Sequence, residues 1–266
     1  MRSSTTDLSS KELDRLLPGQ TVVFRKSLAS TNDFAAKKAG GYGLLVVADQ
    51  QTAGRGRLGR SWVSPPGVNI YMSIAFLPAI SQRKTPLLSL AAGLSAALAI
   101  KAVTGLEIRL KWPNDLLAGK EKKLGGILLE TRLGADKFPF SVAGIGINVN
   151  MPKASFPADI ARTATSVLAE TRAKTNRCVL IAAVCHEFDY WLSVLRKDGE
   201  KGVQKLLKAY RAISDTIGKK VSVQTGELKL EGTASGIDQE GRLLLRTASG
   251  PKRISAGEVQ SLRAAK

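Results

Sequence analysis

The chain has 266 residues, of which 44% are hydrophobic, so it can bury a full core and divide into a larger and a smaller domain. Its formal net charge is +18 and its pI is about 10.1. This charge could serve nucleic-acid binding, but the basic residues are dispersed, and no Lys/Arg tail, zinc-finger spacing or RNA-recognition aromatic motif is present. Solubility, or attraction to an acidic ligand or partner, explains the charge equally well.

The first elements predicted along the chain are a helix over residues 9–17 and a strand over residues 21–26. The run Ser30-Thr31-Asn32-Asp33 then resembles the N-cap of a helix that ends at Gly40-Gly41. The N-terminus lacks a basic segment followed by an apolar one. We therefore expect no signal peptide and a cytoplasmic protein.

A glycine- and arginine-rich loop follows the next predicted strand, residues 44–48. Residues 54–60 read Gly-Arg-Gly-Arg-Leu-Gly-Arg, and no Asp or Glu occurs between Asp49 and Glu107. Glycines let the backbone approach a ligand closely, and guanidinium groups pair with phosphate or carboxylate oxygens. Because nothing nearby in the sequence neutralises the arginines, the loop predicts an anion-binding site.

Two other interpretations of this loop compete with anion binding. It matches the dinucleotide fingerprint G-x-G-x-x-G, which requires a helix starting on the loop and an acidic residue about 20 positions later. Here Ser-Pro-Pro-Gly at 64–67 cannot continue a helix, and the acidic residue is absent. The second alternative is a solvated basic turn.

The middle of the chain predicts a strand at 69–76 and an apolar helix at 87–103, with Pro86 in its first turn and Thr104-Gly105 at its end. We expect this helix to be buried, and too short and too weakly apolar to cross a bilayer. Strands are expected at 107–112, 124–131 and 139–149, and helices at 177–196 and 201–213.

The two cysteines, Cys178 and Cys185, lie seven residues apart on a predicted helix, so their Cα atoms would be ~10 Å apart and cannot form a disulfide. His186 is the only histidine, and no second ligand cluster accompanies it, so we assign no metal ligand to this segment. After Ser214 the pattern changes to short strands at 221–223, 228–233, 243–245 and 259–262, which predict a small β-barrel.

Four blocks of sequence occur together in a fixed order: Ser30-Thr31-Asn32, then 51–60, Lys-Trp-Pro-Asn-Asp at 111–115, and Lys-Leu-Gly-Gly-Ile-Leu at 123–128. Together with Gly-Ile-Gly-Ile-Asn-Val-Asn at 144–150, they closely resemble the biotin protein ligases, from about Phe24 onward. The resemblance implies an α/β (α+β) fold. A mixed-sheet catalytic domain like those of class II aminoacyl-tRNA synthetases, residues 1–215, would precede a small SH3-like β-barrel, residues 216–266.

The resemblance also implies an activity, in which a biotin carboxylate attacks the α-phosphate of ATP and a lysine of the acceptor then attacks biotinyl-5′-AMP. Two anions must meet, so cations near them would stabilise the transition state. The residues implied in catalysis are Arg55, Arg57, Lys111, Lys123 and Asp115. The residues implied in binding biotin and ATP are Ser30, Thr31, Asn32, Gln51, Gly54, Arg55, Gly56, Arg57, Lys123, Gly126 and Asn148.

Some of these residues have a purely structural alternative. Ser30 and Thr31 could cap a helix, either instead of or in addition to contacting a ligand. Trp112-Pro113 reads as packing and turn geometry. Asp115 would organise either Mg²⁺, the third expected cofactor beside biotin and ATP, or the attacking lysine. No further metal ligand is assigned.

The implied partner is the biotin carboxyl carrier domain of a carboxylase. We expect no specific DNA binding, because the family's N-terminal helix-turn-helix needs roughly 60 residues and only 29 precede Ser30. No membrane partner is expected, and the sequence leaves open whether the protein forms a homodimer. The rival functions are a lipoate or octanoate protein ligase, whose Arg-Arg and glycine-rich element is missing here, and a DNA-binding biotin repressor.

Overall fold

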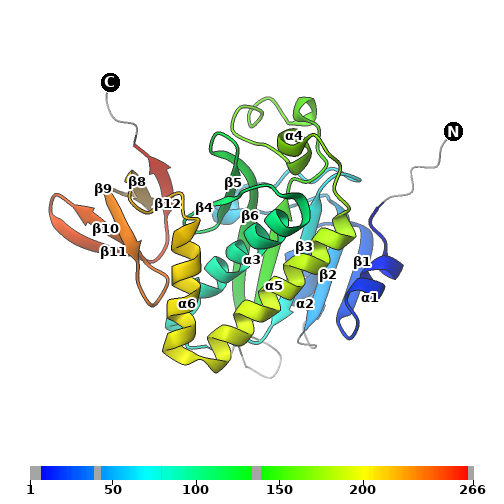
Figure 1. The fold of residues 1–266 in the computed structure, drawn as a ribbon, viewed down its shortest axis with the longest axis horizontal. Helices are drawn as coiled ribbons and strands as arrows, with labels where there is room; N and C mark the ends of the chain where they lie inside the picture. Colours follow the sequence, from blue (N-terminus) through cyan, green and yellow to red (C-terminus); the bar gives the residue numbers. More distant parts are fainter. Residues whose placement is uncertain (1–6, 39–42, 79, 134–138, 263–266) are drawn as a thin grey trace.

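The computed structural model describes residues 7–38, 43–78, 80–133 and 139–262, which form two sheets and the helices around them (Figure 1). The strands of the first sheet are β1 (Thr21–Leu28), β2 (Leu44–Gln51), β3 (Ile70–Phe76), β4 (Arg109–Lys111), β5 (Asp115–Ala118), β6 (Lys122–Leu133) and β7 (Pro139–Ile147). Their order is β1-β2-β3-β7-β6-β5-β4, and the sheet is mixed because β1 and β2 run parallel while the other neighbours are antiparallel.

The second sheet is antiparallel and has five strands in the order β11-β10-β9-β8-β12. They are β8 (Lys220–Thr225), β9 (Leu228–Ile237), β10 (Leu243–Thr247), β11 (Gly250–Ile254) and β12 (Glu258–Ser261). A large mixed sheet followed by a small C-terminal antiparallel sheet confirms the predicted α/β (α+β) class.

The α-helices are α1 (Ser10–Leu16), α2 (Thr31–Lys38), α3 (Pro86–Thr104), α4 (Val167–Thr171), α5 (Arg177–Lys197) and α6 (Gly199–Ala212). The predicted ends of α3 are confirmed: Pro86 lies in its first turn, and Gly105 terminates it in the left-handed conformation that glycine adopts readily. The predicted end of α2, Gly40-Gly41, lies outside the described residues. Three short 3₁₀ segments are η1 (Arg57–Gly59), η2 (Gln82–Lys84) and η3 (Lys153–Ser155).

The helices form layers on the two faces of the first sheet. Helices α3 and α5 cover one face and α2 lies against the other (Figure 1). Alternate side chains of a strand point to opposite faces, and β7 follows this rule. Ala143, Ile145 and Ile147 join the main core under α3 and α5, whereas Phe140 and Val142 pack with α2.

Two of these helices are apolar enough to cross a membrane by length and composition alone. The stretch Gln82–Thr104 has 23 residues, and 18 consecutive residues within it have a mean hydropathy of 1.8, so the expectation that it is too short and too weakly apolar was wrong. Helix α5, with 21 residues, also passes the test. However, 67% and 61% of the apolar 18-residue windows of the two helices are buried, and the helices pack against the sheet and each other, as expected for core helices.

Contacts through Trp112 fix the second sheet to the first. The Trp112 ring is almost fully buried, and its Nε1 donates to the Gly241 carbonyl oxygen at 3.1 Å. The Trp112 backbone N–H donates to Thr216 Oγ1 at 2.9 Å. Gly241 packs so closely on α3 that a Cβ there would lie 3.0 Å from the Leu87 nitrogen. The predicted packing role of Trp112 is therefore confirmed, and the small sheet is held beside the carboxyl end of β4.

Candidate active site

A cavity lies on the α2 face of the sheet, where strand β7 has glycines in place of larger residues. After Phe140 and Val142, the next residues pointing to this face are Gly144 and Gly146. A Cβ on Gly144 would overlap the amide group of Asn32, and one on Gly146 would lie 2.7 Å from Trp62 Nε1. The two glycines thus let Asn32 of α2 and Trp62, which follows the glycine-arginine loop, lie against the sheet.

The cavity has a volume of about 340 Å³ and collects nearly every site residue that the sequence predicts. Those that line it are Ser30, Thr31, Asn32, Gln51, Arg55, Gly56, Arg57, Lys111, Asp115, Lys123, Gly126 and Asn148. Gly54 does not line it. A Cβ on Gly54 would lie 2.5 Å from the Trp62 carbonyl oxygen and 2.6 Å from Ser64 Oγ, so this glycine lets the two sides of the loop pack together.

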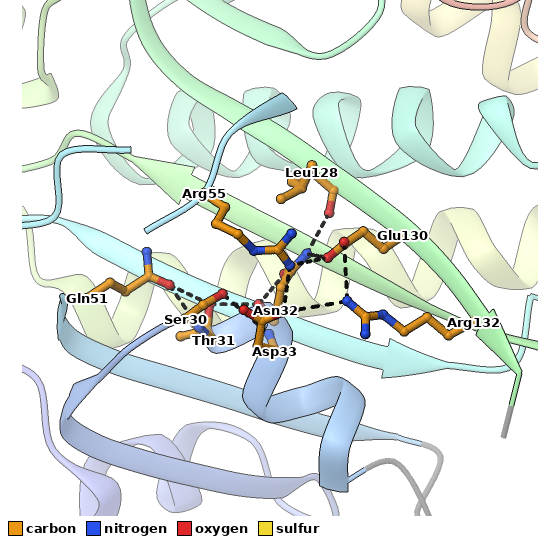
Figure 2. Close-up of polar contacts among 10 residues, drawn as sticks. Ser30, Thr31, Asn32, Asp33, Gln51, Arg55, Leu128, Glu130 and Arg132 are labelled. Atoms are coloured by element: carbon orange, nitrogen blue, oxygen red, sulfur yellow. Dashed lines mark hydrogen bonds and ion pairs between the residues drawn. The ribbon is translucent and has the colours of Figure 1, made fainter. Parts of the chain in front are cut away.

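Buried polar groups form one end of the cavity, at the start of α2 (Figure 2). Gln51 Oε1 accepts hydrogen bonds from the Thr31 backbone N–H at 2.8 Å and from Thr31 Oγ1 at 3.1 Å. Ser73 Oγ lies 2.8 Å from Thr31 Oγ1 and 2.6 Å from Asn32 Oδ1. Ser30 Oγ accepts from the Asp33 N–H at 3.3 Å, as the predicted cap requires. These mutual bonds fix the hydroxyl and amide groups before any ligand arrives.

The Asn32 amide links this polar end to the charges beside it. Its Nδ2 donates to the Leu128 carbonyl oxygen at 3.2 Å and to Glu130 Oε2 at 2.9 Å (Figure 2). Since Asn32 Oδ1 also faces Ser73, its polar atoms are engaged within the protein. The structure therefore gives Asn32 a positioning role, while its predicted contact with a ligand stays a prediction.

Arg55 is paired with two carboxylates. Its Nη2 lies 2.7 Å from Asp33 Oδ1 and 2.9 Å from Glu130 Oε2, and Arg132 contacts the same two acids (Figure 2). Burial acts to raise the pKa of Glu130, but hydrogen bonds from Asn32 and Arg55 outweigh it and hold the pKa below its usual value. No acid lies near the loop in sequence, as stated above, and the carboxylates that neutralise Arg55 come from positions 22 and 75 residues away.

The other two arginines of the loop reach across to the second sheet. Arg57 is half-buried, and its Nη1 donates to Asn114 Oδ1 at 2.9 Å and to the Gly257 carbonyl oxygen at 3.3 Å. Burial lowers its pKa, but a guanidinium still remains charged near neutral pH. Arg60 forms a bidentate pair with Glu258, at 2.6 and 2.5 Å.

Lysines supply further positive charge at this end of the cavity. Lys123 Nζ lies 2.7 Å from Asp115 Oδ1 and 5.6 Å from the centre of the Trp62 ring. Lys111 lines the same wall. The neighbouring Lys120 and Lys122 do not line the cavity, whereas Lys123 does.

Asn148 supports the wall formed by residues 156–164. Its Nδ2 donates a hydrogen bond to the Thr165 carbonyl oxygen at 3.0 Å. The Lys123 backbone N–H donates to the nearby Thr163 carbonyl oxygen at 2.7 Å. Phe156, Ile160 and Ala164 line the cavity from this segment. Sequence reasoning missed these residues because no motif marks them.

Three other lining or bordering groups were also missed: Trp62, Glu130 and Glu258. Within the described residues, Trp62 Nε1 is buried and has no hydrogen-bond partner, so a ligand in the cavity could accept from it. Its position two residues after Arg60 was the available signal. The acids carried no local signal, because their partners are 75 and 198 positions away in sequence.

The cavity therefore combines a neutral polar end, next to Thr31 and Gln51, with a cationic end formed by Arg57, Lys111 and Lys123. Such a site suits a ligand that has a neutral hydrogen-bonding head and an acidic group. A second anion can share the cationic end.

Comparisons with known proteins match both parts of the chain. Residues 25–150 match the model of the Biotin/lipoate A/B protein ligase family, and residues 216–261 match that of the Biotin protein ligase C terminal domain. The chain is 35% identical to the bifunctional ligase/repressor BirA of Bacillus spizizenii, over 91% of this chain and 74% of that protein. It is also 35% identical to the biotin--[acetyl-CoA-carboxylase] ligase of Mycobacterium tuberculosis, over 88% and 86%.

Among solved structures, a biotin protein ligase from Aquifex aeolicus in complex with biotin and ATP aligns with a TM-score of 0.78. The two sequences are 31% identical, and the alignment covers 92% of this chain and 99% of that one.

Proposed function

The chain belongs to the biotin protein ligase family, and from this premise we propose that it uses ATP to attach biotin to a lysine of a carboxylase carrier domain. The observation that carries the proposal is the cavity, which joins the polar start of α2 to a cluster of cations. Its two ends match the two parts of the biotin molecule, a ureido ring and a carboxylate.

We assign the ureido ring to the polar end. The ring offers two N–H donors and one strong acceptor, and Thr31, Gln51 and Ser30 present hydroxyl and amide groups there. The chain of hydrogen bonds among these side chains holds them in place, so little side-chain freedom is lost when the ligand binds. Gly144 and Gly146 let Asn32 and Trp62 lie against the sheet, and Trp62 lines the cavity into which we place the fused rings.

We assign the reacting groups to the cationic end. The biotin carboxylate attacks the α-phosphorus of ATP, the bond from that phosphorus to the bridging oxygen breaks, and pyrophosphate leaves. Arg57, Lys111 and Lys123 reduce the repulsion between the two anions and stabilise the charge that grows on the phosphoryl oxygens. Arg55 is paired with Asp33 and Glu130 and anchors the loop beside the reaction.

In the second step the uncharged amine of an acceptor lysine attacks the acyl carbon of the mixed anhydride, forming an amide and releasing AMP. The amine must lose a proton, and Asp115 is the carboxylate on the cavity wall nearest Lys123. We propose that Asp115 orients the incoming amine and receives its proton.

Mg²⁺ fits the same wall as a companion of ATP. The described residues contain no group of three or more His, Cys, Asp or Glu side chains that could hold a metal ion. Mg²⁺ does not need one, because it is commonly held by one or two carboxylates together with substrate phosphates. In an alternative role, Asp115 would hold the ion during the first step, before the acceptor amine arrives, and the ion would neutralise phosphate charge.

We further propose that residues 1–215 and 216–266 are separate domains, since the C-terminal family model begins at residue 216. A cytoplasmic location is consistent with the free, buried Cys178 and Cys185. The comparisons do not favour the alternatives of a lipoate or octanoate ligase or a DNA-binding repressor as the main activity.

The proposal is tested by pyrophosphate release without acceptor. Protein, ATP and Mg²⁺ are incubated with biotin, lipoate or octanoate, and pyrophosphate is measured with a coupled enzyme assay. We expect release of about one equivalent per active site with biotin and none with the other acids. Release with lipoate or octanoate but not with biotin would contradict the proposal.

A further inference from the structure

Glu258 belongs to the second sheet but completes the cavity of the first. It begins β12 and lies 198 positions from Arg60 in sequence, yet both residues line the cavity. The two Arg60 Nη atoms lie 2.6 and 2.5 Å from the two Glu258 oxygens. The preceding residue, Gly257, accepts from Arg57 at 3.3 Å. The turn that leads into β12 thus receives two of the loop's three arginines.

The Glu258 carboxylate lies within the positive field of the site. Arg60 lowers its pKa most, through the direct hydrogen bond, and Lys111 and Lys123 lower it further from a distance. Glu258 is therefore ionised at neutral pH and attracts the arginines of the loop.

The turn that carries Glu258 is held tightly. A Cβ on Gly257 would lie 2.8 Å from Thr225 Oγ1 and 2.9 Å from the Gln224 carbonyl oxygen. Thr225 Oγ1 in turn donates to the Ala256 carbonyl oxygen at 2.9 Å. Because Trp112 fixes the second sheet to the first, the turn is a firm support rather than a second moving part.

The glycine-arginine loop, by contrast, has an exposed tip. Its base is closed by Trp62 N to Gly54 O at 2.8 Å, and its tip by Gly56 N to Arg60 O at 2.7 Å. At the tip, the Leu58 side chain is 74% exposed and its backbone is left-handed, with φ at 55°. The polar contacts that tie this tip to the rest of the described chain are those of Arg57 and Arg60.

We propose that Glu258 is a positioning residue that latches the glycine-arginine loop over the cavity, so that the C-terminal domain retains the acyl-adenylate until the acceptor arrives. The inference rests on the proposed function for its ligand, but the latch itself is a contact of the free protein. Since the pair is partly exposed, its loss should change the closing equilibrium only a few-fold, about 3- to 10-fold with the accompanying Arg57 contact.

Limited proteolysis tests the latch without any ligand. Trypsin is added to wild type, Glu258→Gln and a control, Glu231→Gln, which removes an exposed ion pair with Lys229 on the same sheet. Cleavage after Arg57 is followed by intact mass. We expect Glu258→Gln to be cut about 3- to 10-fold faster than wild type, and Glu231→Gln at the wild-type rate. Equal rates for all three proteins would overturn the latch.

Adenylate release tests its consequence. Each protein is loaded with biotin and ATP and freed of excess ligand, and the loss of bound adenylate is timed. Glu258→Gln and Arg60→Glu should release it about 3- to 10-fold faster, and the double variant Arg60→Glu/Glu258→Arg should return toward the wild-type rate. Absence of rescue would refute the pairing, since a purely structural defect would add in the double variant. If wild type forms no adenylate, the proposed function fails, while the proteolysis result still decides the latch.

Discussion

Replacing Lys123 by alanine removes one of the three cations that we assign to the reacting groups. The Lys123 ammonium lies 2.7 Å from Asp115 Oδ1 and faces the cavity from β6. In the alanine variant, the phosphoryl group that gains charge during adenylation would no longer be stabilised by the Lys123 ammonium. Removal of one charge-assisted donor from a developing anion typically costs ~2.7–4 kcal/mol, which is a factor of about 100–1,000 in rate.

The same substitution should leave the fold nearly unchanged. The Lys123 side chain is 39% exposed, and partly exposed ion pairs contribute only about 0–1 kcal/mol to stability. Thermal unfolding of Lys123→Ala should therefore stay close to that of wild type. A large loss of rate with a small loss of stability is the expected combination.

The assay is biotin-dependent pyrophosphate release, measured in a single turnover without acceptor. Lys120→Ala is the matched control, because Lys120 is exposed and lies outside the cavity lining. We expect the control to release pyrophosphate at the wild-type rate, and Lys123→Ala at least 100-fold more slowly. Near-normal release with slow transfer to a carrier would contradict a role for Lys123 in adenylation and assign it to the second step.

Three further outcomes are expected. Gly144→Ala places a methyl group against Asn32 and should displace that side chain, so the biotin dissociation constant should rise about tenfold or more in calorimetry. An unchanged dissociation constant would mean that the sheet surface at Gly144 does not shape the biotin site. Burial raises the pKa of the Cys178 and Cys185 thiols, so a thiol reagent should label them only after denaturant is added, and rapid labelling of the native protein would contradict their burial. DNA association should disappear between about 50 and 200 mM salt with or without biotin and ATP, whereas a footprint at physiological salt would mean specific recognition.

The residues that sequence could place in the cavity are those in contiguous blocks. The blocks 30–32, 51–57, 111–115 and 123–126 supply most of the lining, although Gly54 does not reach it, and each block lies at one end of a strand or at the start of a helix, so one local motif fixes both the backbone and the side chain. The sheet order then brings these ends together. The capping role of Ser30 and the packing role of Trp112 followed from the same local chemistry.

The pairings of the arginines could not be predicted in this way. Arg55 meets Glu130, and Arg60 meets Glu258, only because the topology brings β6 and β12 beside the loop. Periodicity carries no signal for such a meeting. The same limit explains why the loop looked unneutralised in the sequence.

Short strands were missed for a different reason. Strand β5 follows Asn114, and its first residue is Asp115, so it reads as the end of a turn. Strand β11 contains a glycine and a proline, which argue against an interior strand. It is an edge strand of the second sheet, where the missing N–H of a proline does not break a hydrogen bond between two interior strands. Pairing with β10, not propensity, makes it a strand.

ATP-dependent biotinylation of a carrier lysine is tested most directly by measuring the mass of the acceptor. A biotin carboxyl carrier domain is incubated with the protein, Mg²⁺ and biotin, with and without ATP, beside a variant carrier whose acceptor lysine is replaced by arginine. We expect a mass gain of one biotinyl group, seen only with ATP and only on the carrier that keeps its lysine. A carrier that gains no mass under conditions in which the protein is folded and binds biotin would contradict it.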